Sequence, residues 1–297
     1  MKISAVLVAK DEEKNIQRCL KSLKDFADEI IVVDDGSTDG TVELAKKYTD
    51  KIFQHESKGY VEPARNFAIS KASGDWILII DADEELPQSL AKKLSQIANS
   101  GEFDFVKMPR KNIIFGKWIE NTGWWPDYQI RFFKNGKVKW QDKIHSVPSA
   151  SGKEKILEPN ETNAITHYNY QSVSQFVEKL NNYTTWEVLA SEVGFRSTNV
   201  FEKPSEEFVS RFYSKKGYED GFHGVALSRL MAFYSLVTEL KIWEKEGFPD
   251  SEADSFELVE KELKKTQKLF WYWVLTEKIK RSKNPLKKLS YKVRRKL

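Results

Sequence analysis

Residues 76–83 read WILIIDAD, so two aspartates, Asp81 and Asp83, directly follow five apolar residues. Such a short apolar run is typical of a strand buried on both faces of a parallel sheet. Because side chains alternate along a strand, the two carboxylates leave it on the same side, about 7 Å apart. Open α/β sheets bind ligands at the carboxyl ends of their strands, so this pair is a candidate site for Mg²⁺ or Mn²⁺. The alternative is that the pair only ends the strand or caps the helix that Pro87 opens.

The chain before this stretch alternates strand and helix signals at short intervals. Apolar runs at residues 3–8 and 29–33 predict two further buried strands. Between them, residues 16–23 repeat apolar side chains at helical spacing, and Asp11 is the expected N-cap. A later helix is expected to end at Gly74, because glycine is the usual residue after a helix. This alternation predicts a parallel sheet covered by helices on both faces.

A second acidic pair follows the strand at residues 29–33. Asp34 and Asp35 are expected at the same edge of the sheet as the first pair. A carboxylate there can accept a hydrogen bond from a nucleobase N–H or a ribose hydroxyl. Arg65, on a predicted helix between the two pairs, can pair with a phosphate or with these carboxylates. A surface arginine is the alternative.

The pattern changes after about residue 101, first to strands and then to helices. Asn135-Gly136 predicts the turn of a hairpin between residues 129–133 and 137–140. The sheet is therefore expected to become mixed. From about Ser172 onward the chain is predicted to be helical.

The C-terminus differs in charge from the rest of the chain. Residues 278–297 hold ten Lys or Arg and no acid, and the whole chain carries +4, which leaves −6 for residues 1–277. Each cation near an anionic leaflet contributes about 1 kcal/mol, so this segment suits a lipid surface. A merely solubilising terminus is the alternative. The acidic body argues against an extended nucleic-acid-binding face.

Aromatic residues are concentrated in the predicted helices around residues 208–243 and 269–275. Beside a basic segment they resemble an interfacial membrane surface, and a small helical core or a dimer interface is an equal alternative. The longest apolar run has seven residues, whereas a membrane-spanning helix needs roughly 20. No signal-peptide pattern opens the chain. We therefore expect a cytoplasmic protein, peripheral on the inner face of the membrane.

Taken together, residues 4–16, 29–41, 64–66 and 74–83 resemble the family 2 inverting glycosyltransferases with a GT-A fold. The resemblance implies a Rossmann-like mixed sheet with helices on both faces and a helical C-terminal region. It also implies a sugar-nucleotide donor, most often a UDP-sugar, and a divalent metal, Mn²⁺ or Mg²⁺. Matched residue by residue, it implies donor contacts from Val8, Ala9, Glu12, Asp34, Asp35, Arg65, Asp81, Ala82 and Asp83.

Three of these residues take distinct roles by the same resemblance. Asp35 is similar to the nucleobase contact, Asp81 would face the ribose or the sugar, and Asp83 would bind the metal. Asp11 departs from the pattern, because relatives commonly carry asparagine at that position.

The second half is similar to bacterial transferases of the lipopolysaccharide-core glucosyltransferase type. The similarity lies in WPDYQIRFF at residues 125–133, IHS at residues 144–146 and KGYEDGF at residues 216–222. Relatives usually carry an acid where Ser146 stands, and the Glu-Asp base motif of many family 2 enzymes is absent. Asp127 is therefore the expected general base, although it can also be a plain turn residue.

Two histidines are further candidates. His145 can complete the metal site through a ring nitrogen. His167 can contact phosphate or acceptor, but a hydrogen-bonded core histidine is the favoured interpretation.

These observations predict transfer of a hexose such as glucose from UDP to a hydroxyl of a glycolipid or polyprenyl-linked glycan, in cell-envelope polysaccharide synthesis. The expected domains are a transferase domain at 1–170, with a donor half at 1–100 and an acceptor half at 101–170, and a helical region at 171–297. The alternative function is a nucleotide-binding regulatory domain of the receiver type. That alternative gives Asp81 and Asp83 no role.

Overall fold

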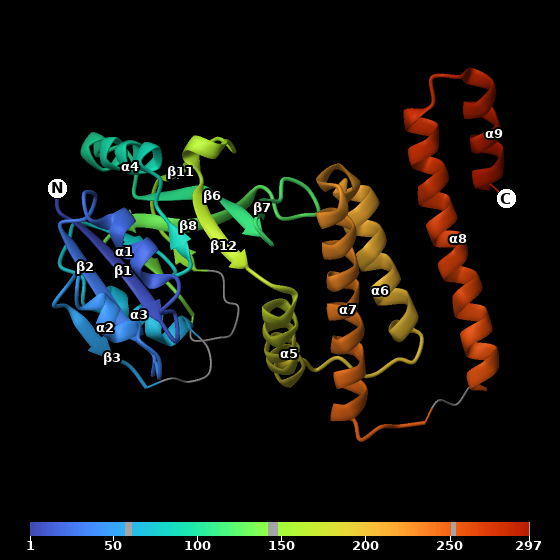
Figure 1. The fold of residues 1–297 in the computed structure, drawn as a ribbon, viewed down its shortest axis with the longest axis horizontal. Helices are drawn as coiled ribbons and strands as arrows, with labels where there is room; N and C mark the ends of the chain where they lie inside the picture. Colours follow the sequence, from blue (N-terminus) through green and yellow to red (C-terminus); the bar gives the residue numbers. More distant parts are fainter. Residues whose placement is uncertain (57–60, 142–147, 251–253, 297) are drawn as a thin grey trace. The chain divides into compact units, whose positions relative to one another are not determined.

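The computed structural model describes residues 1–56, 61–141, 148–250 and 254–296 (Figure 1). The chain forms two compact units. The first comprises residues 1–118 and 124–169, and the second comprises residues 119–123 and 170–297.

The first unit is built on a mixed sheet with the strand order β3-β2-β1-β4-β8-β6-β12-β5, and β7 and β11 also pair with β6. Strands β3, β2, β1 and β4 pair parallel with one another, whereas β8 is antiparallel to both β4 and β6. The predicted mixed sheet is therefore confirmed. The strands are β1 Ile3–Ala9, β2 Glu29–Asp34, β3 Ile52–Gln54, β4 Trp76–Ile79, β5 Glu84–Glu85, β6 Phe105–Ile114, β7 Lys117–Trp118, β8 Asp127–Lys134, β11 Glu154–Ile156 and β12 Ile165–Tyr170.

Helices cover both faces of this sheet, as predicted. The side chains of β1 alternate between two cores, because Leu7 packs in the larger cluster and Val6 in the smaller one. The larger cluster includes the buried faces of α1 (Ile16–Leu23) and α4 (Gln88–Ser100). The smaller cluster includes Ala64 and Ala68 of α3 (Glu62–Ser70). A short helix, α2 (Thr41–Ala45), follows β2.

The predicted hairpin at Asn135-Gly136 is wrong. The turn itself is present, since Gly136 has a φ of +80° and the Lys137 amide donates to the Lys134 carbonyl at 3.0 Å. However, β4 and β6 occupy both edges of β8. The strand after the turn, β9 (Val138–Lys139), therefore pairs with β10 (Ser149–Ala150) in a separate two-stranded sheet.

Gly74 is not the cap of the preceding helix. That helix, α3, ends at Ser70, and its C-cap is Lys71. A Cβ atom at position 74 would lie 2.5 Å from the Ser4 hydroxyl and 2.8 Å from the Ser4 amide nitrogen. Glycine is therefore required here by the close approach of the chain to β1.

Asp11 is likewise not a helix cap. The N-cap of α1 is Asn15, and Asp11 lies in the left-handed region with a φ of +53°. Its carboxylate accepts hydrogen bonds from the Thr38 amide at 2.7 Å and the Thr38 hydroxyl at 3.2 Å. Asp11 thus ties the loop after β1 to the loop after β2.

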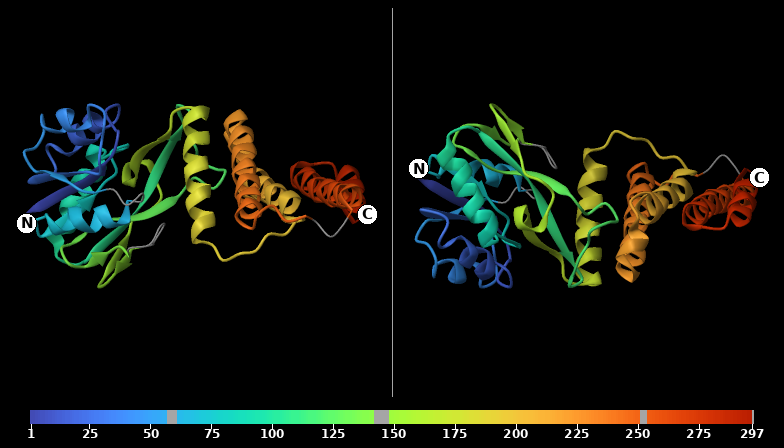
Figure 2. Two further views of the ribbon diagram at one scale, coloured as in Figure 1. Left: turned by 90° about the horizontal axis from the view of Figure 1, so that it is seen from below. Right: turned by 90° about the horizontal axis from the view of Figure 1, so that it is seen from above.

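The second unit is helical, and several of its aromatic residues pack in a helical core. Phe208, Val209 and Ala232 form a buried cluster against which Phe212, Tyr213, Phe270 and Trp273 pack. None of the helices in the described ranges is long and apolar enough to cross a membrane. Figures 1 and 2 show the helices α5 Val173–Ala190, α6 Asn199–Val209, α7 Phe222–Lys245, α8 Ser255–Arg281 and α9 Pro285–Lys296.

Asp220 anchors the segment at residues 119–123 inside the second unit. Its buried carboxylate accepts hydrogen bonds from the Asn121 amide at 3.2 Å and the Thr122 hydroxyl at 2.6 Å. Arg211 donates to the Thr122 carbonyl at 2.9 Å. These contacts explain why residues 119–123 belong to the second unit although they lie between β7 and β8 in the sequence.

Candidate active site

The candidate donor residues lie where β1, β2 and β4 end. Ala9 is opposite Asp34 in the parallel register, and the Asp35 amide donates to the Ala9 carbonyl at 2.9 Å. Ala9 is buried and Val8 is half-buried beside it. Glu12 is half-buried, and its amide donates to the Thr41 hydroxyl at 2.7 Å. The structure thus places the predicted donor edge on neighbouring strand ends of one unit.

Asp81 lies between two arginines. Its Oδ1 is 2.8 Å from Nη2 of Arg65, and its Oδ2 contacts Arg131 of β8. Burial alone would raise the pKa of Asp81, but the two guanidinium groups hold it well below its usual range. The carboxylate is therefore ionised, and Arg65 engages a carboxylate rather than standing free on the surface.

Glu84 extends this network, although the sequence analysis did not single it out. It is buried and accepts from Arg131 Nη2 at 2.9 Å and from the Asp81 amide at 2.9 Å. Arg110 Nη1 lies 3.4 Å from its Oε1. Burial would lower the pKa of Arg131, but Asp81 and Glu84 raise it. Charged groups that are this buried persist because they are paired.

Asp127 lies at the far end of the same network. Its Oδ2 is 2.7 Å from Nε and 2.6 Å from Nη2 of Arg110. Gln129 donates to it at 2.9 Å and Asn112 at 3.2 Å. Burial would raise the pKa of Asp127, but Arg110 and these hydrogen bonds lower it. Its side chain is 24% exposed, so the ionised carboxylate is accessible.

Asn112 connects Asp127 to a histidine. The Nδ2 atom of this buried asparagine donates to the Trp124 carbonyl at 2.9 Å as well as to Asp127, so its Oδ1 faces the other way. Nδ1 of His167 lies 2.7 Å from that Oδ1. Because an amide oxygen only accepts, Nδ1 carries a proton, and in the neutral ring Nε2 has the lone pair.

The Nε2 atom of His167 lies 3.4 Å from Oδ2 of Asp83. A lone pair and a carboxylate oxygen at this separation fit as two ligands of one divalent cation, and Asn112 supplies the supporting hydrogen bond that ligating histidines usually have. Within the described ranges, no group of three His, Cys, Asp or Glu side chains forms a metal site. Mg²⁺ commonly takes one or two protein ligands plus phosphate and water oxygens, so two ligands suffice. His145, the other predicted ligand, lies outside the described residues.

The second acidic pair has its own partners. Asp35 Oδ1 lies 2.7 Å from Nδ1 of His55, whose ring packs against Phe67 with centroids 5.5 Å apart. Asp34 accepts from the Ser37 amide at 3.2 Å. His55 was missed, because a single histidine after a two-residue apolar run carries no signal in the sequence.

Comparisons with known proteins agree on the class of protein. The model of the family described as Glycosyl transferase family 2 matches residues 4–157, more than half of the chain. An uncharacterized glycosyltransferase of Rickettsia typhi is 30% identical over 260 residues, covering 82% of this chain and 87% of the relative. The glycosyltransferase SunS of Bacillus phage SPbeta is 35% identical over 150 residues, covering 49% of this chain and 34% of that protein.

Among solved structures, TarS 1-349 of S. aureus covers 86% of this chain and 95% of its own, with 16% identity and a TM-score of 0.43. The family match at residues 4–157 includes Asp81, Asp83, Glu84 and Asp127. The regulatory-domain alternative loses its support, because the matching family and the Rickettsia relative are both glycosyltransferases. The chain is a glycosyltransferase with a GT-A fold and belongs to glycosyl transferase family 2.

Proposed function

We propose that the protein is an inverting transferase that moves a hexose such as glucose from a UDP-sugar to a hydroxyl of a glycolipid or polyprenyl-linked glycan, in cell-envelope polysaccharide synthesis. One observation carries this proposal. A continuous chain of polar contacts joins Asp81 to Asp127 and, through Asn112, to His167 and Asp83. It joins candidate donor, metal and acceptor residues within one unit.

The donor contacts are proposed from position and chemistry. Asp35 and Asp34 accept hydrogen bonds from the nucleobase and ribose, and the strand-end residues Val8, Ala9 and Ala82, with Glu12, line the same edge. Arg65 is placed to exchange its carboxylate partner for a donor phosphate, since guanidinium groups bind both. Asp81 faces the ribose or the sugar.

We assign the metal to Asp83 and His167, with His145 as a further candidate ligand. A bound Mn²⁺ or Mg²⁺ supplies positive charge that stabilises the departing diphosphate. The hydrogen bond from His167 to Asn112 fixes the ring so that Nε2 faces Asp83.

Asp127 is the proposed general base. It takes the proton from the acceptor hydroxyl as that oxygen bonds to the anomeric carbon, while the bond from that carbon to the diphosphate oxygen breaks. Attack from the face opposite the leaving group inverts the configuration. Arg110 and Asn112 keep Asp127 ionised and oriented for this step.

The domain organisation of the chain is also a proposal. Residues 1–170 carry the transferase, with donor contacts from 1–100 and acceptor contacts from 101–170. Residues 171–297 form the helical region, whose basic end associates peripherally with the inner face of the cytoplasmic membrane. The ten cations of residues 278–297 support this, because cytoplasmic leaflets carry anionic lipids.

The test is a transfer assay on the purified protein. It is incubated with a panel of UDP-hexoses, Mn²⁺ and a bacterial lipid extract, and both released UDP and sugar in the lipid phase are measured. The proposal expects metal-dependent UDP release with at least one donor and label in the lipid phase. Release of no UDP from any donor would contradict it.

A further inference from the structure

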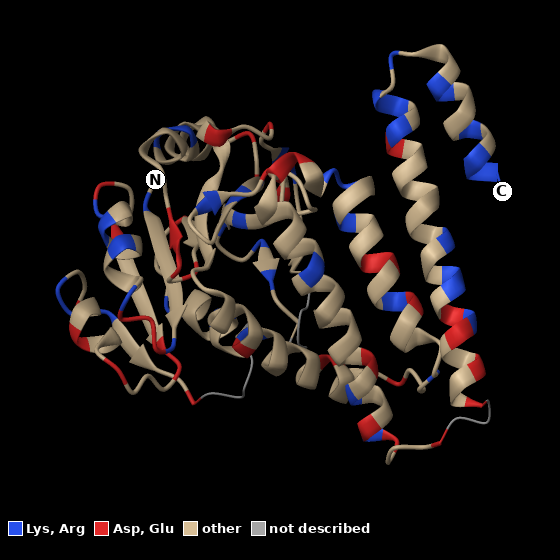
Figure 3. Cartoon of the chain, turned by 45° about the vertical axis from the view of Figure 1, so that its right-hand side comes forward, with Lys and Arg blue, Asp and Glu red and all other residues tan. Residues whose placement is uncertain are grey.

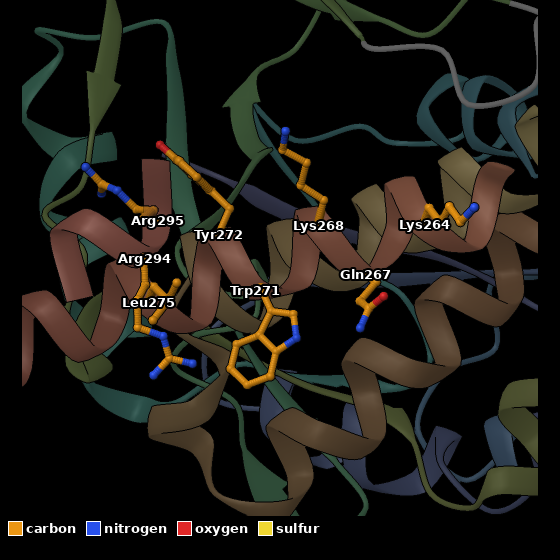
Figure 4. A pocket seen from close by; sticks show the side chains of 8 residues that line it. All are labelled: Lys264, Gln267, Lys268, Trp271, Tyr272, Leu275, Arg294 and Arg295. Atoms are coloured by element: carbon orange, nitrogen blue, oxygen red, sulfur yellow. The ribbon is translucent and has the colours of Figure 1, made fainter. Parts of the chain in front are cut away.

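A groove of about 390 Å³ lies between α8 and α9 in the second unit. The two helices are antiparallel, because Arg295 donates to Thr276 at 3.1 Å and the Lys278 ammonium lies 5.7 Å from the Tyr291 ring centroid. Figure 4 shows the side chains that line the groove, which are Lys264, Gln267, Lys268, Trp271, Tyr272, Leu275, Arg294 and Arg295.

The charge of the groove lining has one sign. Four of the eight side chains are cationic and none is acidic. Glu260 neutralises Lys264 at 2.6 Å, and the Arg295 guanidinium lies 5.3 Å from the Tyr272 ring centroid. In the part of the chain that the structure describes, no carboxylate forms an ion pair with Lys268 or Arg294. Figure 3 shows further Lys and Arg along α8 and α9. The groove thus offers two cations for an anionic ligand.

Apolar side chains surround these cations and remain in water. Trp271 is 46% exposed and Tyr272 is 47% exposed. On α9, Leu286, Leu289 and Val293 recur at i, i+3 and i+7 and are 77%, 60% and 54% exposed. A helix with a narrow apolar stripe and many cations is typical of a segment that lies in a membrane interface.

We propose that the groove binds the phosphate of an anionic lipid headgroup, while the α9 stripe enters the adjacent acyl boundary. Lys268 and Arg294 provide the charge, and arginine suits phosphate because its donors match the oxygens. Trp271 and Tyr272 provide aromatic rings of the kind enriched at the headgroup level. A nucleic acid would satisfy the cations but would leave the Leu286, Leu289 and Val293 stripe in water, so a lipid is the better match.

This inference deepens the proposed function, because it gives the membrane partner a defined site. It is tested on the full chain by sedimentation with phosphatidylcholine vesicles that contain or lack phosphatidic acid. Binding is expected only with the anionic lipid. The variant Lys268→Glu/Arg294→Glu is expected to bind at least about tenfold more weakly. Lys46→Glu/Lys47→Glu, with the same change of net charge on exposed lysines of the first unit, is expected to lose less than about threefold.

Two variants that leave the net charge unchanged distinguish binding in the groove from general electrostatic attraction to the vesicle. Trp271→Ala is expected to weaken vesicle binding about tenfold, whereas Phe256→Ala, 77% exposed on the same helix, is not. Circular dichroism on each variant checks that it folds. Equal losses for groove and control variants would overturn the proposal, as would equally tight binding to a single-stranded oligonucleotide or displacement from vesicles by millimolar inorganic phosphate. UDP binding, measured separately on the unaltered chain, tests the donor site independently.

Discussion

His167 and Asp83 are brought together by an antiparallel strand pair, in which His167 of β12 lies opposite Glu84 of β5. Nε2 of His167 lies 3.4 Å from Oδ2 of Asp83, and the Tyr168 amide donates to the Asp83 carbonyl at 2.9 Å. The backbone pairing therefore fixes the distance between the two proposed metal ligands. Asn112 then sets the orientation of the ring.

Replacing His167 by glutamine removes the proposed nitrogen ligand while keeping a polar side chain. We expect the dissociation constant of UDP in the presence of Mn²⁺ to rise at least about tenfold, because one of the proposed protein ligands is lost. Titration calorimetry measures this. His223→Gln, on α7, is the control and should leave the constant unchanged. An unchanged constant in the His167 variant would remove this residue from the metal site.

Replacing Asp127 by asparagine tests the proposed base. The amide keeps a hydrogen-bond acceptor for Arg110 but cannot take a proton, so the transfer rate is expected to fall about 10²- to 10⁴-fold. UDP affinity should stay within about twofold. The measurements are kcat for transfer and the dissociation constant of UDP. A variant with the normal transfer rate would show that another group accepts the proton.

Glu29 gives a prediction for acid stability. Burial would raise its pKa, but hydrogen bonds from Lys51, Ser4 and Ser73 lower it to about 2. Because the pKa in the folded state is lower than in the unfolded state, this stabilisation is complete above about pH 4.5 and is lost as the pH falls towards 2.

We therefore expect Glu29→Gln to lower the free energy of unfolding by of order 3 kcal/mol at pH 7. The gap between variant and original protein should shrink by about 2 kcal/mol at pH 3. Denaturant titrations at the two pH values measure the gap. The same gap at both values would contradict the prediction.

Substitutions at Asp220 and at its neighbour Glu219 give a test variant and a matched control. Asp220→Asn weakens the acceptors for the Asn121 amide and the Thr122 hydroxyl, so we expect the free energy of unfolding to fall by about 1–3 kcal/mol. Glu219→Gln removes an exposed carboxylate whose distance to Lys216 is 3.8 Å, and it should change stability by less than about 0.5 kcal/mol. Similar losses in both variants would show that Asp220 is not an anchor.

Much of the first unit could be predicted because its signals are local. The buried residues of α1 are Ile16, Cys19, Leu20 and Leu23, the same four side chains that define its helical spacing. The apolar strands β1, β2 and β4 were found for the same reason. The hairpin at Asn135-Gly136 failed because strand pairing is not local. A turn signal does not reveal that both edges of the preceding strand are already occupied.

In the candidate site, too, residues with a local sequence signal could be predicted, and residues that depend on strand pairing could not. Asp81 and Asp83 could be found because they come shortly after the buried strand β4. Arg110 could not, because it becomes meaningful only through the register that places it opposite Asp127 in the β6–β8 pair. That register includes an irregularity after Val106, which no local pattern predicts.

The most direct measurement is calorimetric titration of the purified protein with UDP, with and without Mn²⁺, repeated on Asp83→Ala. Our account predicts binding that Mn²⁺ strengthens at least about tenfold in the original protein, and no effect of Mn²⁺ in the variant. Circular dichroism should show that the variant is folded. UDP binding that is equally tight in both proteins and indifferent to Mn²⁺ would contradict the central claim that Asp83 holds a metal at a donor site.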